Sequence, residues 1–259
     1  MSSVCAVATK QFRLTAITYV SGDRVGFGLA AISLFPVFIV AQLVALVAVR
    51  RDWQTYVLLV GIILNVVFNA LLKDAIKEPR PGRCDEDTFD SGSVDEYGMP
   101  SNHAQFMGFL AMYVALFLFH RVEAPRWELC AWSLLAFSAA QLVCVSRVYL
   151  GYHSVEQVSV GMVVGVVAGS AWFGCYAMYL EGLGSRLAQQ NWAKRFLLRD
   201  TSGIRNVAVF EHAALHGSLH KRPRASCAQD LVWEFRQLSK TMEPEEKAAL
   251  RRDVLEAVM

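Results

Sequence analysis

Charged residues are scarce in this chain, and their scarcity is the first clue to its class. Asp, Glu, Lys and Arg together make up only 19% of the 259 residues, whereas hydrophobic residues make up 54%. The mean hydropathy of +0.33 points to a membrane protein. The formal net charge is +2, so there is no basic excess that would suggest a nucleic-acid partner.

Three further patterns are missing. The six cysteines are scattered, with no pair at zinc-ligand spacing, so the sequence predicts neither a metal centre nor a disulfide framework. The acidic residues between positions 85 and 96 lack the alternating spacing of a calcium loop. The first two dozen residues show no charged and then apolar signal followed by a cleavage site, so no removed signal peptide is expected.

Long apolar runs occupy most of the first 180 residues. They cover residues 26–49, about 56–72, 104–119, 127 to about 145, and 155–180. The sequence therefore predicts an all-α, multi-pass transmembrane helix bundle with about five spans. Gly161, Gly165 and Gly169 recur at four-residue intervals, which favours close packing against another helix. Asn65 and Asn69, on one face of the second run, are expected to pack against neighbouring helices.

Polar segments at the two ends divide the chain into four parts. Residues 1–25 and 181–225 are expected to lie at the membrane surface, residues 26–180 to form the transmembrane domain, and residues 226–259 to form a polar helical tail. Trp192 and Phe196 stand among basic residues in the segment 186–199, which predicts a helix along the membrane surface. No function is predicted for the tail.

Three polar motifs interrupt the apolar runs. Residues 73–81 read K-x6-R-P, residues 100–103 read P-S-N-H, and residues 146–153 read S-R-x5-H. An arginine offers a rigid fork of donors that suits phosphate oxygens, and a neutral imidazole can attack phosphorus. Taken alone, the last motif is equally consistent with an Arg and a His that only anchor helix ends at the membrane interface.

The predicted spans place all three motifs on one side of the membrane. Two spans separate the loop of residues 73–103 from the loop of residues 146–153, so both loops emerge on the same face. Once the three motif cations are set aside, the opposite face is the more basic, and we expect it to be cytoplasmic. Its basic residues are Arg50, Arg51, Arg121, Arg126, Arg186, Lys194, Arg195 and Arg199.

The order and spacing of the motifs resemble the type 2 phosphatidic acid phosphatase superfamily. Four segments are similar to its dolichyl diphosphatase branch: residues 78–81 (EPRP), 97–101 (YGMPS), 146–150 (SRVYL) and 198–202 (LRDTS). The resemblance implies hydrolysis of dolichyl diphosphate to dolichyl phosphate at the lumenal face of the endoplasmic reticulum membrane, which recycles the lipid carrier for N-glycosylation. The implied partners are the bilayer and a polyprenyl diphosphate lipid.

The same resemblance assigns roles to the motif residues. His153 is the nucleophile, which implies a phosphohistidine intermediate, and His103 is the general acid. No metal ion or other cofactor is implied, because fixed cations cover the charge of the phosphate. Two positions depart from the superfamily pattern: Asn102 replaces a glycine, and Gln157 replaces an aspartate four residues after the nucleophile. The residues expected to bind phosphate are Lys73, Arg80, Ser101, Asn102 and Arg147.

The residue that orients His153 is open between two neighbours. If His153 opens the next helix, Glu156 and Gln157 lie one turn farther along the same face, and either could accept a hydrogen bond from the imidazole. We predict Gln157, because it holds the position of the superfamily aspartate, with Glu156 as a possible substitute.

Three other functions are compatible with the motifs, because the motif residues are expected to bind the phosphate and not the lipid tail. The first is a phosphatase for another lipid, such as phosphatidate or an isoprenoid monophosphate. The second is a non-catalytic lipid-binding or lipid-scrambling protein, which the presence of both His103 and His153 disfavours. The third is a vanadate-containing haloperoxidase, which the multiple spans disfavour.

Overall fold

The computed structural model describes residues 9–12, 17–81, 97–204 and 206–215. Residues up to 204 belong to one compact unit, and the short helix α9 (Val207–Leu215) belongs to a second. The predicted tail of residues 226–259 and the acidic segment of residues 85–96 lie outside the described residues.

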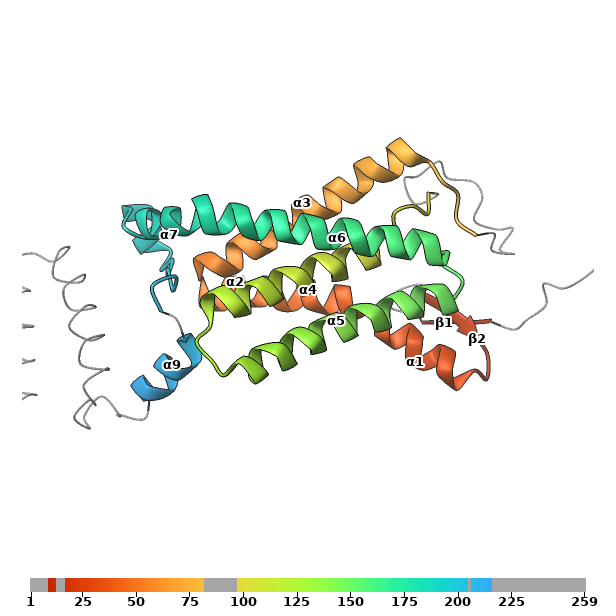
Figure 1. Ribbon diagram of the computed structural model, residues 1–259, viewed down its shortest axis with the longest axis horizontal. Helices are drawn as coiled ribbons and strands as arrows, with labels where there is room; N and C mark the ends of the chain where they lie inside the picture. Colours follow the sequence, from red (N-terminus) through yellow and green to blue (C-terminus); the bar gives the residue numbers. More distant parts are fainter. Residues whose placement is uncertain (1–8, 13–16, 82–96, 205, 216–259) are drawn as a thin grey trace, which may run out of the picture. The chain divides into compact units, whose positions relative to one another are not determined.

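The first unit is built almost entirely from helices (Figure 1). They are α1 (Arg24–Ile32), α2 (Phe35–Arg50), α3 (Trp53–Ile76), α4 (Asn102–Arg121), α5 (Arg126–Tyr149), α6 (Val155–Cys175), the π-helical turn η3 (Tyr176–Leu180), α7 (Glu181–Ala188) and α8 (Asn191–Arg195). Five segments are long and apolar enough to cross a membrane: Arg24–Arg50, Trp53–Ile76, Asn102–Arg121, Arg126–Tyr149 and Val155–Ala188. The predicted multi-pass helical fold is confirmed.

Several helix boundaries differ from the prediction. The second span is longer than the expected residues 56–72, because α3 continues to Ile76 and so includes Lys73. The single surface helix expected over residues 186–199 is wrong. Gln190 adopts an extended conformation (φ −70°, ψ 146°) that separates α7 from α8. A short antiparallel hairpin of β1 (Thr9–Phe12) and β2 (Ile17–Val20) was not predicted.

Helix α4 lies at the centre of the bundle. Half of its span is buried inside the protein, whereas the other four spans are between 22% and 33% buried. The predicted glycine stripe explains its close approach to α6. A Cβ atom at Gly161 would lie 2.7 Å from the Ser101 carbonyl oxygen, and one at Gly169 would lie 2.5 Å from the Phe109 carbonyl oxygen. The expectation of close packing at this stripe is confirmed.

Polar side chains also hold α3 against α4 inside the bundle. Gln105 is fully buried, and its amide nitrogen donates to the Asn65 side-chain oxygen at 3.0 Å. Asn69 donates to the Gln105 side-chain oxygen at 2.8 Å and to the Pro100 carbonyl at 3.2 Å. Because a buried polar group is costly without a partner, this network fixes the position of α4 relative to α3. The expected packing of both asparagines against a neighbouring helix is confirmed.

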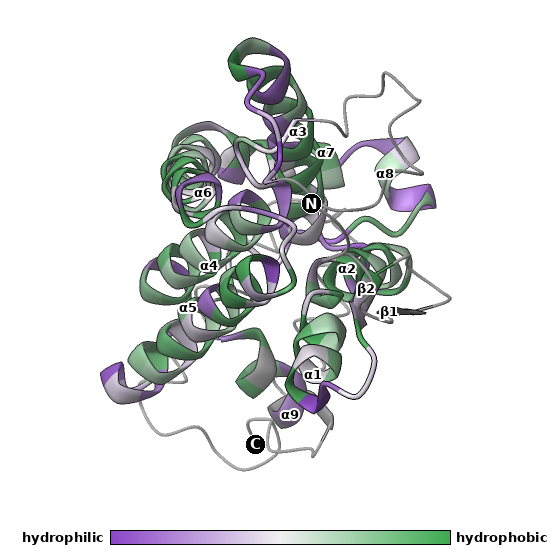
Figure 2. Ribbon diagram, turned by 90° about the vertical axis from the view of Figure 1, so that its right-hand side faces the viewer, coloured by the Kyte–Doolittle hydropathy of each residue, from purple (hydrophilic) through white to green (hydrophobic). Residues whose placement is uncertain are grey.

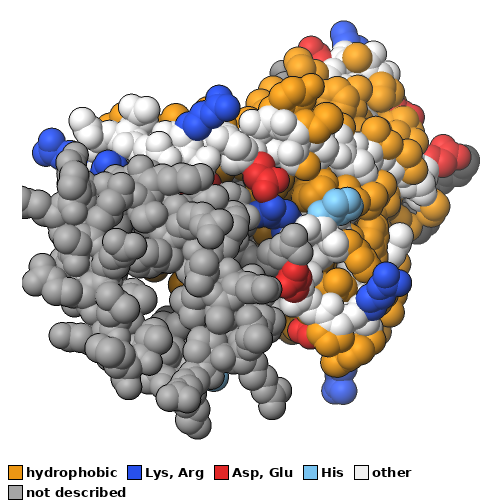
Figure 3. Space-filling model, turned by 60° about the vertical axis from the view of Figure 1, so that its left-hand side comes forward, with side chains coloured by type: hydrophobic (Ala, Val, Ile, Leu, Met, Phe, Trp, Pro, Cys, Tyr) orange, Lys and Arg blue, Asp and Glu red, His pale blue; other side chains and the backbone are white. Residues whose placement is uncertain are grey.

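The outward faces of the helices are apolar. Seen end-on, the helices carry hydrophobic residues over much of their length (Figure 2). Large side chains such as Leu71, Trp127 and Leu134 are each more than 60% exposed, and hydrophobic side chains cover much of the described surface on one side of the protein (Figure 3). A soluble protein rarely exposes so much contiguous apolar surface, and a lipid-facing bundle requires it.

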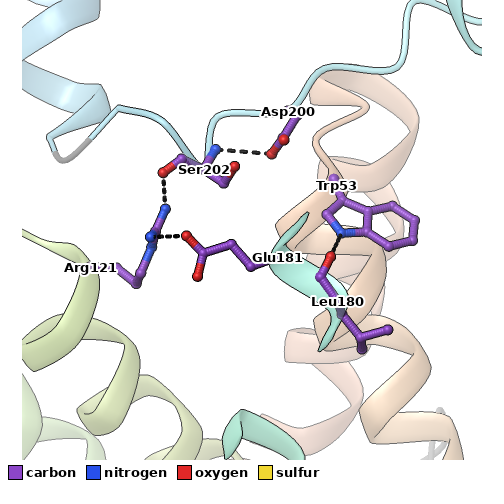
Figure 4. Close-up of polar contacts among 6 residues, drawn as sticks. All are labelled: Trp53, Arg121, Leu180, Glu181, Asp200 and Ser202. Atoms are coloured by element: carbon purple, nitrogen blue, oxygen red, sulfur yellow. Dashed lines mark hydrogen bonds and ion pairs between the residues drawn. The ribbon is translucent and has the colours of Figure 1, made fainter. Parts of the chain in front are cut away.

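A set of polar contacts connects several segments at the end of the bundle where α4 ends. Arg121 donates to the Glu181 carboxylate and to the Ser202 carbonyl, and Trp53 donates to the Leu180 carbonyl at 2.8 Å (Figure 4). The Thr201 hydroxyl donates to Asp52 at 2.6 Å. Residues 199–202 therefore connect the start of α3 with the end of α4 and the start of α7.

Candidate active site

The three motifs meet at the opposite end of the bundle. Helix α3 ends there, α4 begins there, and the turn between α5 and α6 lies at the same end (Figure 1). Each motif lies at the end of a helix whose direction the span order dictates, so residues far apart in sequence come together.

The first motif supplies Lys73 and Arg80. Lys73 lies in the last turn of α3 and is buried, with 6% of its surface exposed. Lys77 then adopts the left-handed conformation (φ 54°), which ends α3. The segment that follows is fixed by an amide hydrogen bond of 2.7 Å from Gly98 to the Glu78 carbonyl. Arg80 follows, half-buried.

The second motif forms the N-terminus of α4. Ser101 is fully buried at the N-cap position, and its amide donates to the Gln157 carbonyl at 3.1 Å. Asn102 and His103 begin the helix and are half-buried. Within the described residues, Ser101 Oγ, Asn102 Oδ1 and Arg80 Nε are buried without a hydrogen-bond partner. The hydroxyl and the guanidinium are donors, and the first amides of a helix favour an anion, so this corner suits phosphate oxygens.

The third motif folds into a tight turn that brings Arg147 next to His153. Gly151 has φ +73°, a conformation that would be strained for a residue with a side chain, and the chain turns back at this point. As a result, the amides of Tyr152 and His153 both donate to the Arg147 carbonyl, at 3.0 and 3.3 Å. The Arg147 guanidinium carbon lies 3.9 Å from the centre of the Tyr152 ring, a cation–π contact. The spacing S-R-x5-H is the length of this turn.

The Tyr152 ring is held by the N-terminal part of the chain. It packs in a buried cluster with Ile17 of β2 and with Ala30 and Leu34 near the two ends of the α1–α2 junction. The hairpin and α1 thus support Tyr152, and through it Arg147, although both elements lie far from the third motif in sequence.

Gln157 contacts the imidazole of His153. Its side-chain oxygen lies 3.2 Å from His153 Nδ1, and both side chains are buried. Ser154 caps α6 and forms a reciprocal capping box with Gln157, which fixes the Gln157 side chain in the first turn. Glu156, the substitute considered from the sequence, is exposed on the other side of that turn. The geometry therefore favours Gln157 as the neighbour of the imidazole.

Burial and positive charge keep the His153 ring neutral. Burial, together with the positive charges of Arg147, Arg80 and Lys73, lowers the pKa of His153 from its ordinary 6.5 to about 3, against the opposing effect of the hydrogen bond to Gln157. His103 lies within electrostatic range of the same three cations and of His153. At neutral pH, then, His153 has a lone pair on one ring nitrogen, which is the form that can attack phosphorus.

Within the part of the chain that the structure describes, no three His, Cys, Asp or Glu side chains gather as a metal site would require. The charged groups that do converge on His153 are the three cations of the motifs. Their chemistry suits an anionic substrate with several oxygens.

Comparison with known proteins identifies the family of this chain. Residues 54–180 match the PAP2 superfamily. The chain is 39% identical over 218 residues to "Dolichyldiphosphatase 1" of Rhinolophus ferrumequinum, covering 82% of this chain and 90% of that protein. The chain belongs to the PAP2 superfamily. The predicted relationship to the dolichyl diphosphatase branch is confirmed, and the chain is an enzyme of this phosphatase class.

Two further proteins show lower identity to the chain. The PAP2 protein is 35% identical over 183 residues to "Dolichyldiphosphatase" of Saccharomyces cerevisiae, covering 69% of this chain and 73% of that protein. Among solved structures it is similar to the PAP2-type phosphatidylglycerolphosphate phosphatase of Bacillus subtilis, with 22% identity and a TM-score of 0.49, over 60% of this chain and 78% of that chain.

Sequence reasoning missed two side chains of this PAP2 site. Tyr152 lies under Arg147, and Glu78 accepts a hydrogen bond of 3.0 Å from the Gln157 amide. Tyr152 immediately precedes His153, so an aromatic residue beside the expected nucleophile was an available signal. Nothing in the spacing linked Glu78 to Gln157, because the two residues are 79 positions apart.

Proposed function

We propose that this PAP2 enzyme hydrolyses dolichyl diphosphate to dolichyl phosphate and inorganic phosphate, and so recycles the lipid carrier for N-glycosylation. The observation that carries the proposal is the convergence of Lys73, Arg80 and Arg147 on a buried, neutral His153 at one end of a membrane-spanning bundle. The similar proteins of Rhinolophus ferrumequinum and Saccharomyces cerevisiae are both named dolichyldiphosphatases, and these names indicate the lipid substrate.

In the proposed reaction His153 Nε2 attacks the terminal phosphorus of the diphosphate. A P–N bond forms, and the bond from that phosphorus to the bridging oxygen breaks. His103 gives a proton to the departing dolichyl phosphate. Water then attacks the phosphohistidine, the P–N bond breaks, and His103 takes the proton from the water. Lys73, Arg80, Arg147, Ser101 and the amides at Asn102 hold the phosphoryl oxygens throughout.

The site is proposed to face the lumen of the endoplasmic reticulum. The opposite end carries Arg50, Arg51, Arg121 and Arg126 at the ends of four spans, and basic residues near span ends favour the cytoplasmic side. A diphosphate released into the lumenal leaflet would then meet the cations directly at the headgroup level.

One assay tests the substrate. The purified protein in detergent is offered dolichyl diphosphate, dolichyl phosphate and phosphatidate at equal concentrations, and released phosphate is measured. The diphosphate should be hydrolysed with the highest kcat/KM. A preference for phosphatidate would keep the phosphatase chemistry and contradict the proposed substrate.

Removal of metal ions should leave turnover unchanged. Lys73, Arg80 and Arg147 supply the positive charge that a magnesium ion would otherwise bring to the phosphate. Phosphate release should therefore proceed at the same rate in excess EDTA. Loss of activity in EDTA, with recovery on addition of magnesium but not of potassium, would contradict the proposed mechanism.

A further inference from the structure

The Gln157 side chain makes hydrogen bonds at both of its ends. Its oxygen faces His153 Nδ1 at 3.2 Å, and its nitrogen donates to the Glu78 carboxylate at 3.0 Å and to the Pro79 carbonyl at 2.9 Å. Gln157 is 99% buried, with 1% of its surface exposed, so water does not compete for these bonds. The amide thus connects the imidazole to a carboxylate from the first motif.

The partners of Gln157 fix which way its amide points. The Pro79 carbonyl can only accept a hydrogen bond, and an ionised Glu78 carboxylate can only accept as well. The amide nitrogen must face them, and the oxygen must face His153. An amide oxygen only accepts, so His153 Nδ1 carries the proton and Nε2 has the lone pair. The tautomer that attack on phosphorus requires follows from the acceptors on the far side of Gln157.

Glu78 is held in place by contacts of its own backbone. Its carbonyl accepts the 2.7 Å hydrogen bond from the Gly98 amide, and Pro79 pairs with Tyr97. Gly98 lies against the Gln157 amide so closely that a Cβ atom there would be 2.5 Å from both its nitrogen and its oxygen. The segments around residues 78 and 98 therefore enclose the amide and leave it one orientation.

The charge of Glu78 adds to this effect. A hydrogen bond to an ionised acceptor is roughly twice as strong as one between neutral groups. When the His153 ring becomes positively charged on forming the phosphohistidine, the Glu78 carboxylate, one amide away, lowers the cost of that charge. The Pro79 carbonyl alone would orient the amide but would supply no net charge.

We propose that Glu78 is a positioning residue for His153 and acts through Gln157. The carboxylate fixes the Gln157 amide, and the amide fixes the imidazole with Nε2 directed at the phosphoryl group. This inference rests on the proposed role of His153 as the nucleophile. It assigns to Glu78 no contact with the substrate.

A double-mutant cycle tests the proposal. Gln157→Ala should lower kcat by about tenfold to a hundredfold, as losses of groups that orient an active imidazole often do, and leave KM nearly unchanged. Glu78→Ala should lower kcat within the same range, and Glu78→Gln, which keeps an acceptor oxygen and removes the charge, should lie between Glu78→Ala and the wild type. In the Gln157→Ala background, Glu78→Ala should lower kcat no further. Glu156→Gln, an exposed carboxylate one position from Gln157, is the matched control and should leave kcat unchanged.

A purely structural role of Glu78 predicts a different pattern. If Glu78 only shaped the loop that carries Arg80, its loss would raise KM, and the two substitutions would have additive effects. Additivity would overturn the proposal. If Glu78→Ala does not accumulate as folded protein, the same cycle is measured with Glu78→Gln in its place. A wild-type kcat for Glu78→Gln would then overturn the proposal. The cycle is measured on whichever of the three test lipids is hydrolysed fastest, so it can be read even if dolichyl diphosphate is not the substrate.

Discussion

Replacement of His153 by alanine should abolish formation of a covalent phosphoenzyme and lower kcat by at least about 10⁴-fold, because loss of a nucleophile removes the covalent route entirely. The side chain is 4% exposed and neutral, and its contacts at Nδ1 leave Nε2 as the attacking atom. The measurement is a rapid quench in alkaline detergent after mixing with lipid labelled at the terminal phosphate. Radioactivity should remain with the wild-type protein in alkali and be lost in acid, as a phosphoramidate requires.

His120→Ala is the matched control for this experiment. His120 lies on α4, the helix that carries His103, but at its far end, where the ring contacts the Leu116 carbonyl and Phe173. It should keep wild-type turnover and the wild-type amount of phosphoenzyme. If His153→Ala still formed a phosphoenzyme, the nucleophile would be another residue, and the proposed mechanism would be wrong.

The motif spacing predicted that the motif residues converge, because each motif lies at a helix end. Lys73, Ser101 and Arg147 are placed by the direction of α3, α4 and α5, and the order of apolar runs fixes that direction. The distance of six residues between Arg147 and His153 was also informative, since the turn at Gly151 brings the amides of Tyr152 and His153 to the Arg147 carbonyl. Local sequence determines these features.

Contacts between segments that are distant in sequence could not be predicted from the motif spacing and the apolar runs. Glu78 meets Gln157 after α3 ends at Lys77, where a lysine adopts φ 54°, a conformation that residue type does not predict. The β1–β2 hairpin was missed because its strands are only four residues each, too short for a period-two pattern to stand out. The helix expected over residues 186–199 was wrong because amphipathic composition does not reveal a break of one extended residue at Gln190.

Gly165→Ala should destabilise the protein more than any other glycine-to-alanine substitution in α6. A Cβ atom at Gly165 would overlap the Gln105 carbonyl oxygen and lie 2.8 Å from the Phe109 nitrogen and 2.9 Å from the Gln105 carbonyl carbon. All three atoms belong to the α4 backbone, so no side-chain rotation relieves the clash and the two helices must separate. Overpacking of this kind costs about 3 kcal/mol, or roughly 6 to 12 °C in the unfolding midpoint of a protein of this size.

The same separation should reduce activity, because α4 carries Ser101, Asn102 and His103 at its start and Gln105 binds the asparagines of α3. Gly174→Ala on the same helix separates the steric effect from the general effect of removing a glycine. A Cβ atom at Gly174 would meet nothing within 4 Å, so this variant should be neutral or gain up to about 1 kcal/mol from its higher helix propensity. Thermal unfolding of both variants in detergent, followed by tryptophan fluorescence, gives the comparison. Equal midpoints for the two variants would show that α4 and α6 do not meet at Gly165 as closely as the structure requires.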